Sequence, residues 1–230
     1  MKLHFCTITG ADDSVSVKEL NEISKDFPFV EWGILMSANA RDGIPRFPSD
    51  AWQGELAREG KGLNLSAHVC GQWVRAIARG GMPENFWRHA FRFPRVQLNF
   101  HGQTHEFSPE FYVKMKRLTQ QIIFQIDDVN NAVFQEALRL GVNAVPIFDL
   151  SHGAGILPAA WPKPVPGVLC TYAGGLGPEN LKDQLKRIED VVGDQTICID
   201  METRVRSADD KALNLGKVRA CLMIAADYVG

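Results

Sequence analysis

Cysteine, histidine and carboxyl side chains recur at one kind of position in this sequence, the downstream end of short apolar runs. They are Cys6, His68, His101, Asp127, Asp149, Asp200 and Glu202. Thiols, imidazoles and carboxyls exchange protons with a substrate when their pKa is brought near neutral. The same groups also bind divalent cations, but no HxH or HExxH spacing supports such a site. The spacing therefore does not favour a metal site.

Along the apolar runs, residues on one face are apolar and many residues on the other face are polar. In the run 29–37, Trp32 and Ile34 share one face, and Glu31 and Gly33 share the other. Successive side chains of a strand point to opposite faces. One face must pack against helices, so we expect the polar face to point into the lumen of a barrel. Buried charges need partners, and we expect Glu31 to form an internal ion pair with Arg95.

Eight runs are predicted as strands and seven stretches between them as helices. The predicted strands are 3–8, 29–37, 63–70, 96–101, 122–127, 144–149, 168–173 and 196–201. The predicted helices are 17–26, 49–59, 72–79, 109–120, 131–140, 178–192 and 215–228. Ser108-Pro109-Glu110 is typical of a helix start. Glycines and prolines follow Asp149, and they predict that no helix forms there.

This order of elements predicts a single (β/α)8 barrel domain over residues 1–230. A chain of 230 residues gives about 29 residues for each of eight units, which suits a strand–helix repeat. A doubly wound open sheet is the alternative, but no GxGxxG motif follows the first strand. In a barrel, the chemistry-bearing residues above would ring the mouth at the carboxyl ends of the strands.

The composition of the chain argues against some classes of binding partner. The chain has 25 Lys and Arg against 27 Asp and Glu, a formal charge of −2, which argues against nucleic acid and membrane surfaces as partners. No signal peptide or membrane-spanning run is found in the sequence. Five cysteines without a CxxC pair indicate a reduced, cytoplasmic protein. We expect a small-molecule substrate, a phosphorylated sugar, and a monomer or a homodimer.

Six segments, taken in order along the chain, resemble the phosphoribosylanthranilate isomerases of tryptophan biosynthesis. They are HFCTITGADD, GILMSANARDGIPRFPS, VQLNFHG, IFDLSHGAG, TYAGGLGPENL and IDMETRVRS, and LGKVRACL resembles the last helix of that family. No single motif is decisive, but together they cover the chain from end to end. The resemblance implies a (β/α)8 barrel and a cofactor-independent Amadori rearrangement, in which a furanose ring opens and an aldose becomes a ketose.

The resemblance also implies roles for individual residues. Cys6 matches the general base and Asp149 the general acid, and Arg46 matches the residue that holds the anthranilate carboxylate. The segment with Gly174 and Gly175 matches a phosphate-binding loop. The segment after the eighth strand implies substrate contacts; in this chain they are Asp200, Thr203 and Arg204.

Other interpretations of these residues stay open at this stage. Cys6 would also suit a buried apolar position, and Asp149 a capping position. Gly174 and Gly175 would also serve a tight turn before a helix, although backbone amides at a helix start favour an anion. For His68, an interior position with satisfied hydrogen bonds is the favoured interpretation.

The sequence departs from the family at the phosphate element. Where the family has Ser-Ser-Gly after the last strand, this chain has Glu202, Thr203 and Arg204. An inward carboxylate repels phosphate, whereas Arg204 would neutralise it or hold the phosphate itself. The loop after the sixth strand and the extra residues around 82–93 also differ. Three alternatives remain: a related barrel with a different, unphosphorylated ligand, a metal-dependent lyase or hydrolase, and a non-catalytic binding barrel.

Overall fold

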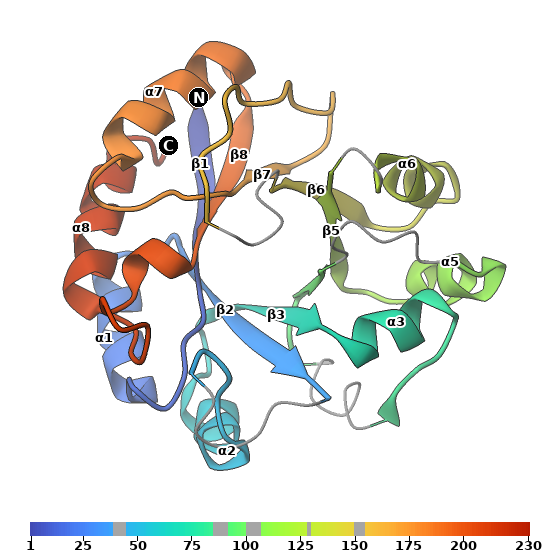
Figure 1. Ribbon diagram of the computed structural model, residues 1–230, viewed down its shortest axis with the longest axis horizontal. Coiled ribbons are helices and arrows are strands. Elements are labelled where there is room, and N and C mark those ends of the chain that lie inside the picture. Colours follow the sequence, from blue (N-terminus) through green and yellow to red (C-terminus); the bar gives the residue numbers. More distant parts are fainter. Residues whose placement is uncertain (39–44, 85–91, 100–106, 128–129, 150–154) are drawn as a thin grey trace.

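The computed structural model describes residues 1–230 except 39–44, 85–91, 100–106, 128–129 and 150–154. Eight parallel strands pair in chain order, and the last pairs with the first, so the sheet closes into a barrel. They are β1 (Lys2–Thr9), β2 (Val30–Ser37), β3 (Asn64–Cys70), β4 (Arg95–Leu98), β5 (Gln121–Ile126), β6 (Ala144–Phe148), β7 (Cys170–Tyr172) and β8 (Thr196–Met201). Helices surround this ring (Figure 1). The predicted (β/α)8 barrel is confirmed.

Several of the helices begin after a residue whose side chain caps the first turn. They are α1 (Val17–Asp26), α2 (Asp50–Glu59), α3 (Gln72–Ala78), α5 (Pro109–Lys116), α6 (Asn131–Arg139), α7 (Leu181–Val192) and α8 (Leu215–Ala226), with a short 3-10 turn, η1 (Thr203–Val205). The hydroxyls of Ser16, Ser49 and Ser108 accept a backbone N–H from the first turns of α1, α2 and α5. α7 begins at Leu181 instead of 178, because residues 177–180 form a turn in which Gly177 N–H donates to the Asn180 side chain.

The connection from β6 to β7 has no helix in its described part, residues 155–169, as predicted. Two polar contacts hold it in place of a helix. The indole of Trp161 donates to Gln184 of α7 at 3.0 Å, and the Tyr172 hydroxyl donates to the carbonyl of Pro162 at 3.0 Å. These contacts attach the segment 155–169, called the strap below, to β7 and α7.

An irregularity in β1 decides which way its side chains point. Leu3 pairs with Ile197 of β8, but Phe5 pairs with the very next residue, Cys198, so His4 is an extra residue in β1. Such a bulge shifts the alternation of the bulged strand by one. Between the bulge and the end of β1, odd-numbered residues therefore face the lumen and even-numbered residues face the helices.

The lumen is polar on one side and apolar on the other. On the polar side, Nη1 of Arg95 donates to both carboxylate oxygens of Glu31, at 2.8 and 2.9 Å, which confirms the predicted ion pair. Thr7 donates to the same carboxylate, and Arg95 also donates to Gln121. The apolar side is a separate cluster of buried residues, namely Ile123, Val145, Ile147 and Ala173. The expectation of a polar lumen therefore holds for one half of the barrel.

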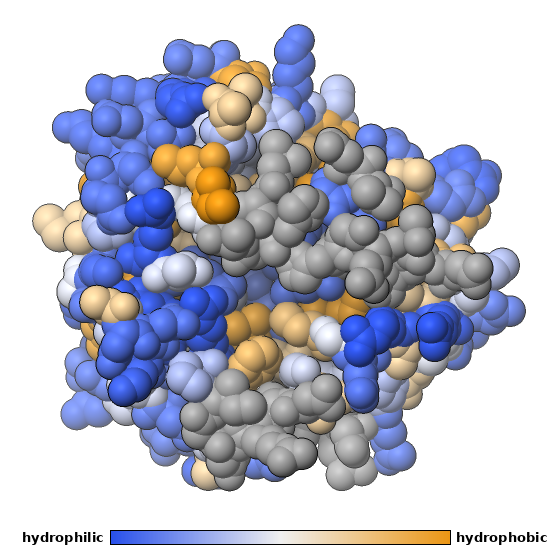
Figure 2. All heavy atoms as spheres, in the orientation of Figure 1, coloured by the Kyte–Doolittle hydropathy of each residue, from blue (hydrophilic) through white to orange (hydrophobic). Residues whose placement is uncertain are grey.

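The outer surface is mostly hydrophilic where helices cover the barrel. Figure 2 shows this on the side of the molecule formed by α1, α7 and α8. No helix in the described part of the chain is both long enough and apolar enough to cross a bilayer.

Candidate active site

A small cavity with a volume of about 40 Å³ opens at the carboxyl ends of β6, β7 and β8. Its walls are Asp149, Gly155, Ala173, Gly174, Gly175, Leu176, Asp200, Met201, Glu202 and Thr203. The cavity therefore brings together six residues singled out from the sequence for chemistry or binding: Asp149, Gly174, Gly175, Asp200, Glu202 and Thr203. This is the end at which (β/α)8 barrels carry their chemistry.

Asp200 is the most perturbed acid of the cavity. It is 9% exposed, and Thr9 Oγ1 donates to its Oδ1 at 2.7 Å. Burial raises the pKa of the Asp200 carboxyl to about 8, and the charges of Glu202, Asp149 and Glu31 add to the effect, while the Thr9 hydrogen bond opposes it. At neutral pH this carboxyl is mostly protonated, so it is able to donate a proton.

Asp149 lies at the end of β6, on the wall of the same cavity. The Gln125 side chain, from the lumen end of β5, donates through Nε2 to Asp149 Oδ2 at 3.2 Å. Gln125 is itself buried, so it fixes the carboxyl from inside the barrel. The sequence placed Asp149 at the mouth correctly, but gave no sign of its contact with Gln125.

His68, from β3, lies in the lumen beside Thr9. Its Nε2 is 3.0 Å from Ser66 Oγ, and its Nδ1 is 3.4 Å from Thr9 Oγ1. Burial lowers the pKa of His68 to about 3, with the charge of Arg95 adding to the effect, so the ring is neutral. Gly33 makes room for it, because a Cβ there would lie 2.9 Å from His68 Nε2. The favoured interpretation of His68 as an interior histidine agrees with this position.

Cys6 is not at the mouth, and the prediction that placed it there is wrong. Three residues of β1 follow it, and its side chain is fully buried in the main apolar core together with Cys221 of α8. It pairs with Ile199 and Val30, which face the helices, while its neighbour Thr7 faces the lumen. Burial raises the pKa of the Cys6 thiol well above its usual range, so no thiolate base forms here.

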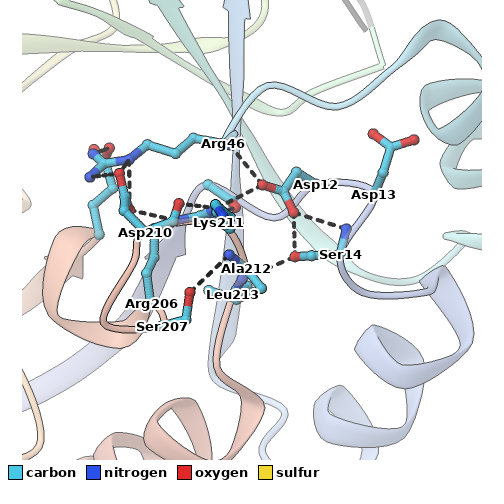
Figure 3. Close-up of polar contacts among 12 residues, drawn as sticks. Asp12, Asp13, Ser14, Arg46, Arg206, Ser207, Asp210, Lys211, Ala212 and Leu213 are labelled. Atoms are coloured by element: carbon cyan, nitrogen blue, oxygen red, sulfur yellow. Dashed lines mark hydrogen bonds and ion pairs between the residues drawn. The ribbon is translucent and has the colours of Figure 1, made fainter. Parts of the chain in front are cut away.

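Arg46 reaches the mouth, but each of its three side-chain nitrogens contacts a carboxylate. Nε and Nη2 donate to Asp210 at 3.0 and 2.8 Å, and Nη1 donates to Glu202. Its backbone N–H donates to Asp12 at 2.7 Å (Figure 3). Arg46 and Asp210 are also the non-glycine residues with positive φ in the described part of the chain. The structure therefore does not leave this guanidinium free for the substrate carboxylate that the resemblance implies.

A second arginine holds the same loops from inside. Arg206 is fully buried and forms ion pairs with Asp12 and Asp210, both at 2.9 Å. Its Nη1 donates to the carbonyl of Gly10 at 2.8 Å. Of this cluster, the sequence pointed to Arg46 alone. Arg206 and the acidic partners carried no sign beyond the acidic loop after the first strand.

The segment after β8 divides its side chains between the cavity and the surface. Glu202 and Thr203 line the cavity. Arg204 turns away from it and donates to Glu179 at 2.8 Å near the start of α7. Glu202 is therefore neutralised by Arg46 and not by Arg204, contrary to the expectation from the sequence.

Gly174 and Gly175 follow β7 with φ of +110° and +67°, values that favour glycine. Asn180 Nδ2 donates to the carbonyl of Gly175 at 2.8 Å. A Cβ on Gly175 would lie 2.6 Å from the carbonyl oxygen of Gly155. The two glycines therefore serve the turn and the close approach of the strap, and phosphate binding by this loop stays a prediction.

Other candidates for the mouth lie elsewhere. Asp127 accepts the backbone N–H of Asn130 at 2.8 Å and lines a different cavity, beside α6. His101 lies outside the described residues. Within the described ranges, no group of three or more His, Cys, Asp or Glu side chains is arranged to hold a metal ion.

A closed (β/α)8 barrel with carboxyls around a cavity at the carboxyl ends of its strands has the architecture of the fold class whose enzymes carry their active sites at that end. Within this class, the chain is similar to solved phosphoribosylanthranilate isomerases. The structure from Thermus thermophilus is 18% identical, with a TM-score of 0.65 and 99% of each chain covered. TrpF from Jonesia denitrificans is 14% identical, with a TM-score of 0.62 and 97% of each chain covered.

A third similar structure holds a ligand. It is a phosphoribosylanthranilate isomerase in complex with reduced 1-(o-carboxyphenylamino)-1-deoxyribulose 5-phosphate, 14% identical, with a TM-score of 0.59, covering 97% of this chain and 98% of that one. No protein-family model and no curated protein sequence matches the chain. The likeness at these identities establishes the shared barrel fold, and it agrees with the resemblance found in the sequence motifs.

Proposed function

We propose that this protein is an isomerase that converts an N-glycosyl arylamine into the corresponding aminodeoxyketose, the reaction type of phosphoribosylanthranilate isomerase. The observation that carries the proposal is the pair of carboxyls on one cavity wall, Asp149 from β6 and Asp200 from β8, of which Asp200 has a pKa raised to about 8. These two residues take over the acid–base roles that the sequence assigned to Asp149 and Cys6.

The chemistry needs one proton donor and one proton acceptor. Protonated Asp200 gives its proton to the furanose ring oxygen as the bond from that oxygen to C1 breaks, which leaves a protonated Schiff base. Asp149 then removes the proton from C2, and the electrons of the C–H bond move toward the nitrogen to give an enolamine. The enolamine becomes the ketone by proton transfer to C1, so no cofactor is consumed.

The positions of the two strands fit these steps. Only β7 separates β6 from β8 in the ring. The ring oxygen and C2 are both bonded to C1, so carboxyls on nearby strands are able to reach both atoms from one side of the sugar. The carboxylates around the cavity would also stabilise the positive charge of the Schiff base.

The rest of the proposal concerns the setting of the reaction. The substrate is a small molecule, and neither nucleic acid nor a membrane takes part. All five cysteines are free thiols, which supports a reducing compartment, and we propose the cytoplasm. We propose a monomer or a homodimer; one similar structure is described as monomers generated from a dimeric phosphoribosylanthranilate isomerase of Thermotoga maritima.

The direct test follows the loss of anthranilate-type fluorescence when the protein is mixed with N-ribosylanthranilate, with and without a 5-phosphate. We expect turnover of at least one of the two compounds. Asp149→Asn and Asp200→Asn should each lower kcat/KM by about 100-fold or more, the usual contribution of a general acid or base.

Cys6→Ala is the matched control, because Cys6 lies outside the lumen. This variant should keep its turnover within a few-fold of the original protein. Normal turnover in both Asn variants would contradict the assignment of the carboxyl pair. Loss of turnover in a folded Cys6→Ala protein, checked by circular dichroism, would contradict the placement of the acid–base pair.

A further inference from the structure

A chain of hydrogen bonds reaches Asp200 through three other polar side chains. Thr9 Oγ1 donates to Asp200 Oδ1 at 2.7 Å and lies 3.4 Å from His68 Nδ1. The other ring nitrogen of His68, Nε2, lies 3.0 Å from Ser66 Oγ. Thr9, Ser66 and His68 are each 1% exposed or less, so bulk water does not compete for these contacts. An inference about this chain rests on the proposed isomerase, because Asp200 is the proton donor of that reaction.

The chain crosses β2 at Gly33. This residue pairs with Thr9 of β1 on one side and with Ser66 of β3 on the other. A Cβ at Gly33 would overlap the Thr9 hydroxyl and lie 2.9 Å from His68 Nε2. Because Gly33 has no side chain, His68 of β3 is able to contact Thr9 of β1 past the strand that separates them.

The charges around the chain favour a neutral imidazole. Burial lowers the pKa of His68 to about 3, and the charge of Arg95 on β4 adds to the effect. At the other end of the chain, the charges that act on Asp200 are the carboxyls of Glu202, Asp149 and Glu31. A neutral imidazole has one nitrogen that donates and one that accepts, so the chain has a direction.

The direction follows from what each group is able to donate. A carboxylate only accepts, so charged Asp200 takes the one hydroxyl hydrogen of Thr9. His68 must then donate from Nδ1 to Thr9 and accept at Nε2 from Ser66. Within the described ranges, the Ser66 hydroxyl has His68 as its one hydrogen-bond partner. Reversing the chain would leave the buried Ser66 hydrogen without an acceptor there, which is costly also when Asp200 is protonated.

We propose that His68 is a positioning residue for the proton of Asp200. By donating from Nδ1 to Thr9, His68 directs the Thr9 hydrogen to Asp200 Oδ1 and so keeps the transferable proton on Oδ2. In the reversed chain, that proton would lie on Oδ1 and bond to Thr9, where the substrate could not receive it. His68 acts through Thr9 and does not need to touch the substrate.

The tautomer of His68 tests this in the original protein. NMR of the ring nitrogens identifies which one carries the hydrogen, and the signals that disappear in His68→Leu belong to His68 among the six histidines. We expect the hydrogen on Nδ1 at pH 6 and at pH 9.5. The Nδ1 signal should shift between these values with a midpoint near pH 8, as Asp200 loses its proton, and this shift should vanish in Asp200→Asn. Hydrogen on Nε2, a mixture of tautomers, or no shift would overturn the proposal.

His68→Leu and His68→Asn separate positioning from packing. Asparagine places an amide N–H near the former Nδ1 and is still able to donate to Thr9, whereas leucine donates nothing. We expect His68→Leu to lower kcat about fivefold, the equivalent of one neutral hydrogen bond, with KM unchanged. The descending limb of its pH profile should move to higher pH, because Thr9 becomes a weaker donor to Asp200. His68→Asn should restore most of the kcat. Equal kcat values in the two variants would overturn the positioning role.

Failure of the reaction would look different from failure of this proposal. If His68 carries its hydrogen on Nδ1 and senses the charge of Asp200, but neither N-ribosylanthranilate compound is turned over, the direction of the chain stands and the proposed isomerisation is wrong. If turnover is found with the hydrogen on Nε2, the isomerisation stands and the role of His68 is wrong.

Discussion

Asp200 is the residue whose protonation state the proposed reaction depends on most. Its pKa is raised to about 8, mainly because the carboxyl is buried, and only the protonated form donates to the ring oxygen. kcat/KM should therefore be constant below about pH 7 and fall as the pH rises through about 8. A pH profile between 6 and 9.5 measures this, and a profile that rises across the same range would contradict the role of Asp200 as the acid.

Thr9 provides an independent check on the same carboxyl. Its hydroxyl donates to Asp200 at 2.7 Å and favours the charged form. Thr9→Val removes that donor, so the pKa of Asp200 should rise and the descending limb of the pH profile should move to higher pH. A limb that moves to lower pH would mean that Thr9 acts in the opposite direction. Thr203→Val is a suitable control, because Thr203 lines the cavity and is exposed to solvent.

The same pKa shift makes stability depend on pH. An unfolded Asp has a pKa of about 3.9, whereas folded Asp200 has one of about 8. Between these values the folded protein binds more protons, so this group's contribution to the free energy of unfolding is full below about pH 4 and is lost as the pH rises to 8. Asp200→Asn should therefore gain stability relative to the original protein as the pH rises from 5 to 8, measured by urea unfolding. A difference between the two proteins that does not change with pH would contradict the shift.

At the scale of single elements, β1 shows why the sequence predicted the fold better than the site. The apolar run 3–8 is a strand, as predicted, but the extra residue His4 turns Cys6 outward and Thr7 inward. Nothing in the alternation of residues 3–8 signals a bulge, because it depends on the register with β8, which is almost 200 residues away. Asp149 and Asp200 were placed correctly because their strands run without such an irregularity.

A substitution at Gly33 of β2 tests how tightly the lumen is packed around this residue. A Cβ at this position would overlap the Thr9 hydroxyl and lie 2.9 Å from His68 Nε2. Both neighbours are buried and hydrogen-bonded, so they have little room to move. Gly33→Ala should lower the free energy of unfolding by about 1–3 kcal/mol, as overpacking does, measured by urea titration.

Gly54 in α2 is the matched control for that substitution. A Cβ there would meet only the end of the flexible Arg58 side chain, at 3.4 Å. Alanine is favoured over glycine inside a helix by about 1 kcal/mol, so Gly54→Ala should stabilise the protein. Equal effects of the two substitutions would mean that the lumen has more free space than the contacts indicate.

At the scale of the whole molecule, the polar part of the lumen could be predicted from the alternation of side chains, and the apolar part could not. β2, β3 and β4 carry the polar faces that the sequence showed clearly, and the ion pair between Glu31 and Arg95 followed from them. β6 is apolar on both faces, with Val145 and Ile147 in the lumen cluster and Ala144 and Phe148 in the main core, so periodicity did not separate lumen from exterior there. The strap from β6 and the arginine cluster at the mouth depend on contacts between loops, which leave no periodic signal.

The buried ion pair between Glu31 and Arg95 joins β2 to β4 within the lumen. Glu31 is 1% exposed and Arg95 is 5% exposed, so Arg95→Met leaves a buried carboxylate that still accepts from the Thr7 hydroxyl but has lost its cationic partner. That variant should lose about 3–5 kcal/mol, whereas Glu31→Gln combined with Arg95→Met should lose much less, because no buried charge is left alone. Urea unfolding of the single and double variants measures the coupling. The charge of Arg95 also lowers the pKa of His68, so the pKa of His68 followed by NMR should rise in Arg95→Met. If the losses in the free energy of unfolding are strictly additive, the two charges act independently of each other. If the pKa of His68 stays unchanged as well, Arg95 does not act on His68.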